Sequence, residues 1–382
     1  MSETDPFRDA IDGLVEHVRA SSDVRRSDRL WPTDPITFQT NPLNLGYGAC
    51  GTAIFLHDVA ELPPDARDWL VAQPVTVAAY PPGLYSGIAG VGWSHVEMGI
   101  EDRGLELFRL VLHSPLAFQA TDVFNGCAGW GMAALALHLR TGQQELADMA
   151  TRAGDYLLDS AQHDEHGTFW PERTTGLVPL GFAYGSSGVA IFLLYLSRVT
   201  GDDRYLAAAR SALEFDIAHG QSRGDELRWG TTTDSEGSRP YWLRGGAGVA
   251  AALIRFASVL HEPRYLELAR RAVRPCGVFF SAAPHLFEGL AAMGEALLDM
   301  FILTGEDSYL AAARQKAEQT LLYRIARPIG TAFPGRYMFR ISHDYGCGGA
   351  GIGLFLHRLT TMQPRRFHDI SPALGVRPFT LE

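Results

Sequence analysis

The chain has 382 residues and an apolar fraction of 46%, so it is long enough to bury a large core. Its formal net charge is −10 and no basic run occurs in it, which argues against nucleic acid or an anionic membrane surface as a main partner. The start lacks the apolar core of a signal peptide, no stretch approaches a membrane span, and four cysteines without CxxC pairing fit a reduced, cytoplasmic protein.

The first predicted element is a helix near residues 6–22. From residue 46 onward, a GxxG motif or a variant of it opens a strongly apolar helix seven times. In the sixth copy Ala292 replaces the second glycine. The leading glycines of the seven copies are Gly48, Gly87, Gly126, Gly185, Gly245, Gly289 and Gly348.

A second repeat is interleaved with the first and reads TGQQELADMA, TGDDRYLAAAR, HEPRYLELAR and TGEDSYLAAAR. Apolar residues at i, i+3 and i+4 with charged residues between them predict amphipathic helices. The repeating unit is therefore an apolar helix, a turn, an amphipathic helix and a connection to the next unit.

Seven such units predict an all-α fold, an (α/α)7 toroid with the apolar helices inside. An open solenoid would need polar capping repeats, whereas the first and last GxxG helices are as apolar as the middle ones. The helix near residues 6–22 would complete the outer layer. We expect one domain over 1–382, with an N-terminal helix and segment at 1–45, repeats at 46–361 and a tail at 362–382.

In a toroid the N-termini of all inner helices face one mouth, and their exposed backbone N–H groups favour anions. For any single copy, the alternative is that GxxG only permits close helix packing. Long insertions precede repeats 4, 5 and 7, namely HDEHGTFWPERTTGLVPLG, SRGDELRWGTTTDSEGSRPYW and RPIGTAFPGRYMFRISHDYG. Such insertions usually form a binding rim, and their aromatic and arginine content suits a peptide or a sugar.

The ordered motifs, with DVFNGCAG, PLGFAYGSSG and RPYWLRGGAG in this sequence, resemble the lanthionine cyclase family. The segment DRLWPTDPITFQTNPLNLGYGACG followed by PPGLYSGIAGVGW is most similar to the cyclase domain of class III lanthipeptide synthetases. The resemblance covers roughly residues 28–360. It implies addition of peptide cysteine thiols to dehydroalanine or dehydrobutyrine, forming lanthionine, methyllanthionine or labionin rings in a dehydrated precursor peptide.

The resemblance also implies that no metal cofactor is bound. The zinc-dependent branch of the family has cysteine and histidine ligands where this chain has Leu243, Phe287 and Glu288. Zinc ligation in proteins uses cysteine, histidine or carboxylate in a tetrahedral array, which Glu288 alone cannot supply.

The catalytic candidates that the resemblance implies are Asp122, Tyr184, Arg239 and Arg244. Without zinc, positive charge from Arg239, Arg244 and the helix N-termini would favour the thiolate. Asp122 and Tyr184 are candidates for proton transfer. The alternatives are that Asp122 is a helix cap, Tyr184 a packed aromatic and Arg239 half of a loop ion pair.

Substrate-binding candidates lie in or beside the GxxG turns; they are Trp242, Tyr241, Glu288, His285, Asn125, Tyr85 and Asp344. For His285, His343 and Asp344, the alternative is a role in the loop or as a helix cap. Cys50, Cys127 and Cys347 also lie at these turns, so a replacement metal or redox site is an alternative to their role as small packing residues.

Two other functions stay open. One is a non-catalytic scaffold that holds precursor peptide for a separate kinase, lyase or dehydratase, because a degenerate scaffold would also have lost the zinc ligands. The chain has no kinase-like HRD or DFG motif, so it cannot activate serine or threonine alone. The other is a carbohydrate-active α/α barrel using paired carboxylates such as Asp122, Glu288 and Asp344.

Overall fold

The structure is a computed structural model that describes residues 5–363, 369–370 and 372–374. The chain divides into two compact units. Unit 1 contains residues 1–114, 280–292 and 314–363, and unit 2 contains residues 115–279, 293–313 and 364–382. The single domain expected from the sequence stays a prediction.

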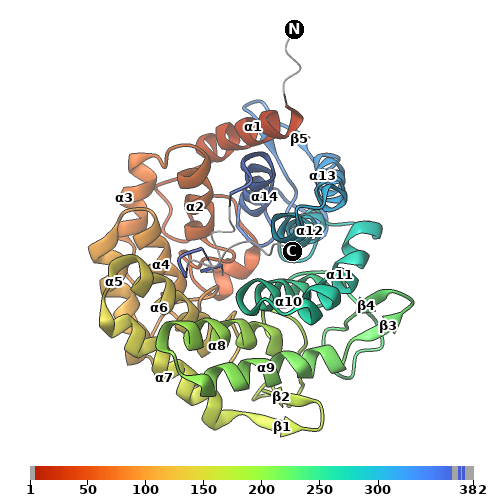
Figure 1. Ribbon diagram of the computed structural model, residues 1–382. Coiled ribbons are helices and arrows are strands. Elements are labelled where there is room, and N and C mark those ends of the chain that lie inside the picture. Colours follow the sequence, from red (N-terminus) through yellow and green to blue (C-terminus); the bar gives the residue numbers. More distant parts are fainter. Residues whose placement is uncertain (1–4, 364–368, 371, 375–382) are drawn as a thin grey trace. The chain divides into compact units, whose positions relative to one another are not determined.

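Helices of two kinds alternate along the chain, as predicted (Figure 1). The helices that follow GxxG turns are α2 (Ala49–Val59), α4 (Ile88–Glu97), α6 (Cys127–Thr141), α8 (Ser186–Thr200), α10 (Gly246–Leu260), α12 (Leu290–Thr304) and α14 (Gly349–Thr361). Their hairpin partners are α3 (Pro64–Ala72), α5 (Glu101–Arg109), α7 (Gln144–Ser160), α9 (Asp203–Ala218), α11 (Pro263–Val278) and α13 (Asp307–Leu321). The predicted N-terminal helix is α1 (Pro6–Ala20).

Short elements occupy the connections. Three antiparallel hairpins begin just before the insertions predicted ahead of repeats 4, 5 and 7 and extend into them: β1 (Gln162–Asp164) with β2 (Gly167–Phe169), β3 (Gln221–Arg223) with β4 (Glu226–Arg228), and β5 (Ile325–Ala326) with β6 (Thr331–Ala332). The 3-10 turns are η1 (Pro35–Gln39), η2 (Leu110–His113) and η3 (Arg336–Met338). None of the described helices combines the length and apolar character that crossing a bilayer requires.

The GxxG motif has a steric cause. The leading glycine is the N-cap of the helix in six repeats. In five repeats a Cβ on the second glycine would lie 1.8–2.5 Å from the carbonyl oxygen of the residue six positions earlier. In α8, for example, a Cβ on Gly188 would lie 2.0 Å from the Phe182 oxygen. The turn can therefore fold back onto its own helix only where that side chain is absent.

Backbone hydrogen bonds join neighbouring GxxG turns in unit 1. Phe287 N–H donates to the Gly346 oxygen (3.0 Å), Gly346 N–H to the Gly46 oxygen (2.8 Å), and Gly46 N–H to the Tyr85 oxygen (2.9 Å). The turns of repeats 6, 7, 1 and 2 are thus adjacent in this order, and the last repeat meets the first. Leu14 of α1 packs against Gly353 of α14, so α1 is the outer partner of the seventh inner helix, as predicted.

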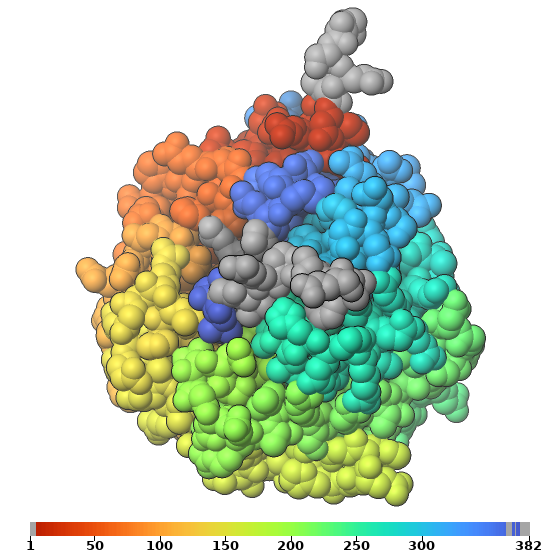
Figure 2. All heavy atoms as spheres, viewed as in Figure 1, coloured from red at the N-terminus to blue at the C-terminus, as the bar shows by residue number. Residues whose placement is uncertain are grey.

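The turns of unit 2 are joined in the same way. Val123 and Phe124 N–H groups donate to the Ala183 oxygen (3.1 and 3.0 Å), and Ala183 N–H donates to the Leu243 oxygen (3.3 Å). These bonds connect repeats 3, 4 and 5. Helices α6, α8 and α10 are buried over most of their length, and α7, α9 and α11 cover them. The side chains of α7 to α11, yellow to teal, fill this unit's surface on the face seen in Figure 2.

We expect Gly188→Ala to destabilise the protein by about 1–3 kcal/mol, because its Cβ would overlap a backbone oxygen that has no room to move. The matched control is Gly277→Ala in α11, where no atom lies within 4 Å of the added Cβ. That change should stabilise the helix by about 0.5–1 kcal/mol. Urea unfolding followed by circular dichroism measures both, and equal effects would contradict the steric explanation.

Candidate active site

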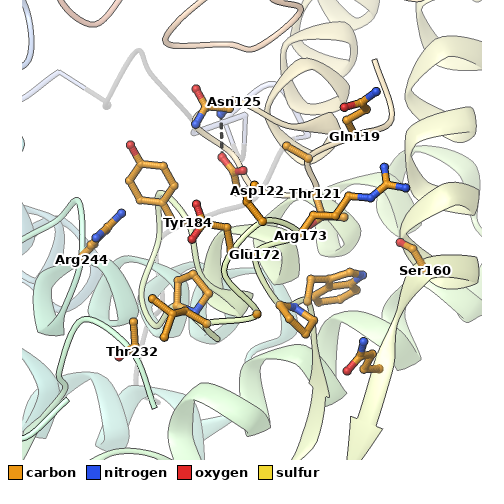
Figure 3. A pocket seen from close by; sticks show the side chains of 18 of the residues that line it. Gln119, Thr121, Asp122, Asn125, Ser160, Glu172, Arg173, Tyr184, Thr232 and Arg244 are labelled. Carbon is orange, nitrogen blue, oxygen red and sulfur yellow. Dashed lines mark hydrogen bonds between the residues drawn. The ribbon is translucent and has the colours of Figure 1, made fainter. Parts of the chain in front are cut away.

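Unit 2 contains a cavity of about 620 Å³ bordered by the turns of repeats 3, 4 and 5 (Figure 3). The insertion that carries β1 and β2 completes its wall. Four residues predicted from the sequence line it: Asp122, Asn125, Tyr184 and Arg244. Three of the four catalytic candidates therefore share one cavity within a single unit.

Asp122 reaches the cavity from the turn that precedes α6. Its Oδ1 accepts the backbone N–H of Asn125 at 2.7 Å, and its carbonyl accepts that of Gly126. Burial raises the pKa of Asp122 to about 6; hydrogen bonds from backbone N–H groups oppose this, and the nearby charge of Glu172 adds to it. A carboxyl group with such a pKa exchanges protons near neutral pH.

Asp122 does not cap α6, whose N-cap is Gly126 and has no side-chain hydrogen bond. Its bond to Asn125 instead closes the turn before the helix, and the same bond recurs in unit 1. Asn44 accepts the N–H of Tyr47 at 2.7 Å, and Asp344 accepts that of Cys347 at 2.7 Å. All three side chains stand four residues before a leading glycine. Asp344 is fully buried, however, whereas Asp122 faces a cavity. The turn-closing hydrogen bond explains why an Asp or Asn stands at this position, and only the cavity distinguishes Asp122.

Tyr184 lies between two flat groups. Its ring stacks on Phe124 at 5.2 Å between centroids, and the Arg244 guanidinium lies 4.5 Å from its centroid in a cation–π contact. The Arg244 Nε is buried and makes no hydrogen bond within the part of the chain that the structure describes. The stack fixes a cationic group and a phenol beside the cavity that Asp122 lines (Figure 3).

A buried carboxylate holds the turn that carries Tyr184. Asp216 of α9 accepts the N–H groups of Gly181 (3.1 Å) and Ser187 (2.9 Å) and the Ser187 hydroxyl, all on Oδ2. Its Oδ1 is buried without a hydrogen-bond partner among the described residues. Burial raises the pKa of Asp216 to about 7, against the effect of these hydrogen bonds. Asp216 thus fastens both ends of the turn around Tyr184.

Sequence reasoning missed several residues that line the cavity. Trp170, Glu172 and Arg173 come from the insertion before repeat 4, and Tyr156 comes from α7. The Glu172 carboxylate lies near Asp122, whose pKa it raises (Figure 3). The composition of the insertion predicts a rim, but nothing in it indicates which of its charged residues turn inward.

The other candidates from the insertion before repeat 5 do not line this cavity within the described residues. Arg239 is exposed, and its backbone bonds to Trp229 and Gly246. Trp242 is buried against Phe182 at 4.9 Å between ring centroids, and Tyr241 is half-buried. Their roles in catalysis or binding stay predictions.

The remaining candidates belong to unit 1. Tyr85 is buried against Phe287, and the Asp344 carboxylate accepts hydrogen bonds from Ser342, Asp34 and Cys347. Burial raises the pKa of Asp344 to about 6. His285 Nε2 lies 3.0 Å from the Pro334 oxygen, and burial lowers its pKa to about 4. Glu288 is exposed. Substrate binding by these residues stays a prediction.

The donor set for a metal ion is poor. Leu243 and Phe287 carry no ligating atom, and Phe287 is fully buried. Throughout the described residues, no three His, Cys, Asp or Glu side chains gather into a cluster that could hold a metal ion. All four cysteines are buried free thiols, and burial raises the pKa of the Cys50 thiol to about 12 and also raises those of Cys127 and Cys347.

Comparison with known proteins identifies the family to which the chain is related. The family described as "Lanthionine synthetase C-like protein" matches residues 39–371. A curated relative, "Probable SapB synthase" from Streptomyces coelicolor, is 30% identical over 347 residues, which are 89% of this chain. The chain spans only 36% of that relative's length.

Solved structures show the fold. The chain is similar to nisin cyclase with a TM-score of 0.63 and 15% identity, over 88% of this chain and 92% of that one. This likeness confirms the all-α class of paired helices predicted from the repeats. A glycoside hydrolase of family 105 from C. acetobutylicum has a TM-score of 0.53 and 11% identity, over 81% of this chain and 97% of that one.

We expect Asp216 to make stability depend on pH. Because its folded pKa is about 7 and its unfolded pKa is ordinary, the folded state keeps a proton that the unfolded state loses between about pH 4 and pH 7. The stability that this group contributes is fully present below that interval and falls as pH rises through it, by about 1.4 kcal/mol per pH unit.

The test compares Asp216→Asn, which keeps the size and an acceptor oxygen, with the wild type by urea unfolding at steps from pH 4.5 to pH 8. The stability of the wild type minus that of the variant should fall with rising pH and then level off. A difference that rises or stays flat would contradict this assignment.

Proposed function

Because the chain belongs to the lanthionine synthetase C-like family, we propose that it acts in lanthipeptide biosynthesis as a cyclase. The proposed substrate is a dehydrated precursor peptide, whose cysteine thiols add to dehydroalanine or dehydrobutyrine. Lanthionine, methyllanthionine and labionin rings are the products considered. The observation that carries the proposal is the cavity in which Asp122, Tyr184 and Arg244 meet.

The reaction needs only proton transfers and charge stabilisation. For lanthionine and methyllanthionine, the S–H bond and the π bond of the alkene break, and a C–S bond forms at the β carbon and a C–H bond at the α carbon. For labionin, that α carbon instead forms a C–C bond with a second dehydroalanine, whose own α carbon takes the proton. A proton thus leaves sulfur and another reaches an α carbon, with no oxidant or reductant. Asp122, with its pKa of about 6, is proposed to take the first proton and return one to the enolate.

Two negative charges must be stabilised in turn, first on sulfur and then on the enolate oxygen. The Arg244 guanidinium, held on Tyr184, supplies a fixed positive charge for both. The N-termini of α6, α8 and α10 belong to the same three turns and add partial positive charge. Tyr184 is proposed as a second proton-transfer group, and Arg239 stays a candidate from the family resemblance alone.

Dehydration of serine or threonine must come from elsewhere. The sequence has no kinase-like HRD or DFG motif, so a separate kinase or lyase activity, on another protein or another domain, is proposed as the partner.

We further propose that ring formation is independent of zinc, on the basis of Leu243, Phe287 and Glu288 at the ligand positions. Protein purified without chelators should contain far less than one zinc per chain by elemental analysis, and a chelator should leave the rate unchanged. One tightly held zinc per chain, lost together with activity on chelation, would refute this.

We expect Asp122→Asn to slow ring formation by on the order of 10²–10⁴, because general acid–base groups contribute factors of this size. Asparagine still accepts the Asn125 N–H, so the turn should persist. The wild-type rate should rise as pH rises through about 6, since the basic form of Asp122 takes the thiol proton. Thiol alkylation with mass spectrometry counts the rings formed from a dehydrated precursor.

Asp344→Asn is the matched comparison, because Asp344 makes the same turn-closing bond but is buried in unit 1. Equal losses in the two variants would assign the effect to turn closure rather than to proton transfer. A reaction without protein gives the background of spontaneous addition. If wild type, Asp122→Asn and that background give equal rates while peptide still binds, the chain is a scaffold and the cyclase proposal fails.

A further inference from the structure

A tight turn in unit 1 holds two residues in an unfavourable conformation. Tyr337 and Met338 have φ of +58° and +63°, a left-handed backbone that side chains with a Cβ disfavour. The turn is closed by the bridge between Pro334 and Ile341 and by a bond from Gly335 N–H to the Arg340 oxygen. Strain of this kind persists where the surroundings impose it, and it often marks a functional segment.

The strained turn presents large apolar side chains to solvent. Tyr337 is 73% exposed, Met338 40% and Phe339 84%, and the rings of Tyr337 and Phe339 lie 6.1 Å apart. Phe38 of η1 is 52% exposed. We call these four residues the aromatic patch. Burying them inside would have been favourable, so their exposure indicates a surface that something else covers.

Arg336 fixes the turn to η1. Its Nε lies 3.2 Å from Asp34, the N-cap of η1, and its guanidinium lies 5.1 Å from the centroid of the Tyr47 ring. The two segments that make up the aromatic patch are therefore joined by a partly buried ion pair. The patch is a supported surface of unit 1 rather than a free loop.

Two arginines flank the patch, apart from Arg336, whose charge is paired with Asp34. Arg29 lies 5.6 Å from the centroid of Phe38, and Arg340 is exposed at the end of the turn. Residues 324–340 contain four arginines and neither aspartate nor glutamate, in a chain whose net charge is −10. An acidic ligand is repelled by most of this protein and attracted here.

We propose that the aromatic patch docks an acidic, apolar segment of the peptide substrate. This rests on the proposed function only in taking a peptide as the substrate. Apolar side chains of the segment would cover Tyr337, Met338, Phe339 and Phe38, and its carboxylates would pair with Arg29 and Arg340. The patch thereby selects a part of the peptide that need not contain the reacting residues.

The probe is a fluorescein-labelled synthetic peptide that alternates Glu with Leu, compared with the same peptide carrying Gln in place of Glu. Fluorescence anisotropy with the full chain should show at least about tenfold tighter binding of the Glu peptide, and the difference should shrink at high salt. Equal binding of the two peptides would overturn the proposal.

Tyr337→Gly separates this role from a structural one. Glycine adopts the left-handed conformation without strain, so the variant should melt at a higher temperature and yet bind the Glu peptide several-fold more weakly. Arg340→Glu should reverse the preference between the peptides, and Leu322→Ser, which changes a 77% exposed side chain outside the patch, should leave it unchanged. Unchanged binding in both Tyr337→Gly and Arg340→Glu would refute the docking surface.

Binding is measured without ring formation, so the two proposals fail separately. A protein that forms no rings but discriminates between the peptides through the patch would retain the docking surface and lose the cyclase. A protein that forms rings at the normal rate but binds the two peptides equally would retain the cyclase and lose the docking surface.

Discussion

Backbone hydrogen bonds between neighbouring GxxG turns set the positions of the residues that line the candidate active site. Ala183 accepts N–H groups from the turn of repeat 3 and donates to the turn of repeat 5, so one residue connects the turns that carry Asp122, Tyr184 and Arg244. Such bonds need neighbouring turns in close approach, which the second glycine permits: a Cβ on Gly248 would lie 2.7 Å from the backbone nitrogen of Phe182 in the turn of repeat 4. The glycines that let each repeat fold therefore also bring together the turns that border the cavity.

The repeats could be predicted because the need for a small residue in each turn and for an apolar inner helix depends only on nearby sequence. Gly188 must be small, and α8 must be apolar, whatever lies elsewhere in the chain. The family resemblance implies Asp122 as a site residue, and the structure puts it at a cavity. Glu172 could not be predicted because it lies in an irregular loop. Asp216 is indistinguishable in sequence from any polar residue of an amphipathic helix, and only its hydrogen bonds set it apart.

Three aspartates, two of them fully buried and one half-buried at the cavity, show that the same group can serve structure or chemistry. Asp122, Asp216 and Asp344 all have raised pKa values because burial disfavours their charge, and all accept backbone N–H groups of GxxG turns. Each therefore fastens a turn. Only Asp122 also borders the cavity, beside an arginine that is held on a tyrosine. A carboxyl group whose pKa is raised by its surroundings can take part in proton transfer only where a substrate has room to approach it.

The bond between Gly346 and Gly46 has a consequence for synthesis on the ribosome. Its partners are separated by 300 positions, so the first repeat leaves the exit tunnel long before its neighbour exists. At roughly 5–20 residues per second, the wait is about 15–60 s. Throughout that time the faces of α1 and α2 that α14 later covers have no partner, and they are natural targets for chaperones. A premature stop after repeat 6 would leave those faces bare permanently, although most of the repeats would have been made.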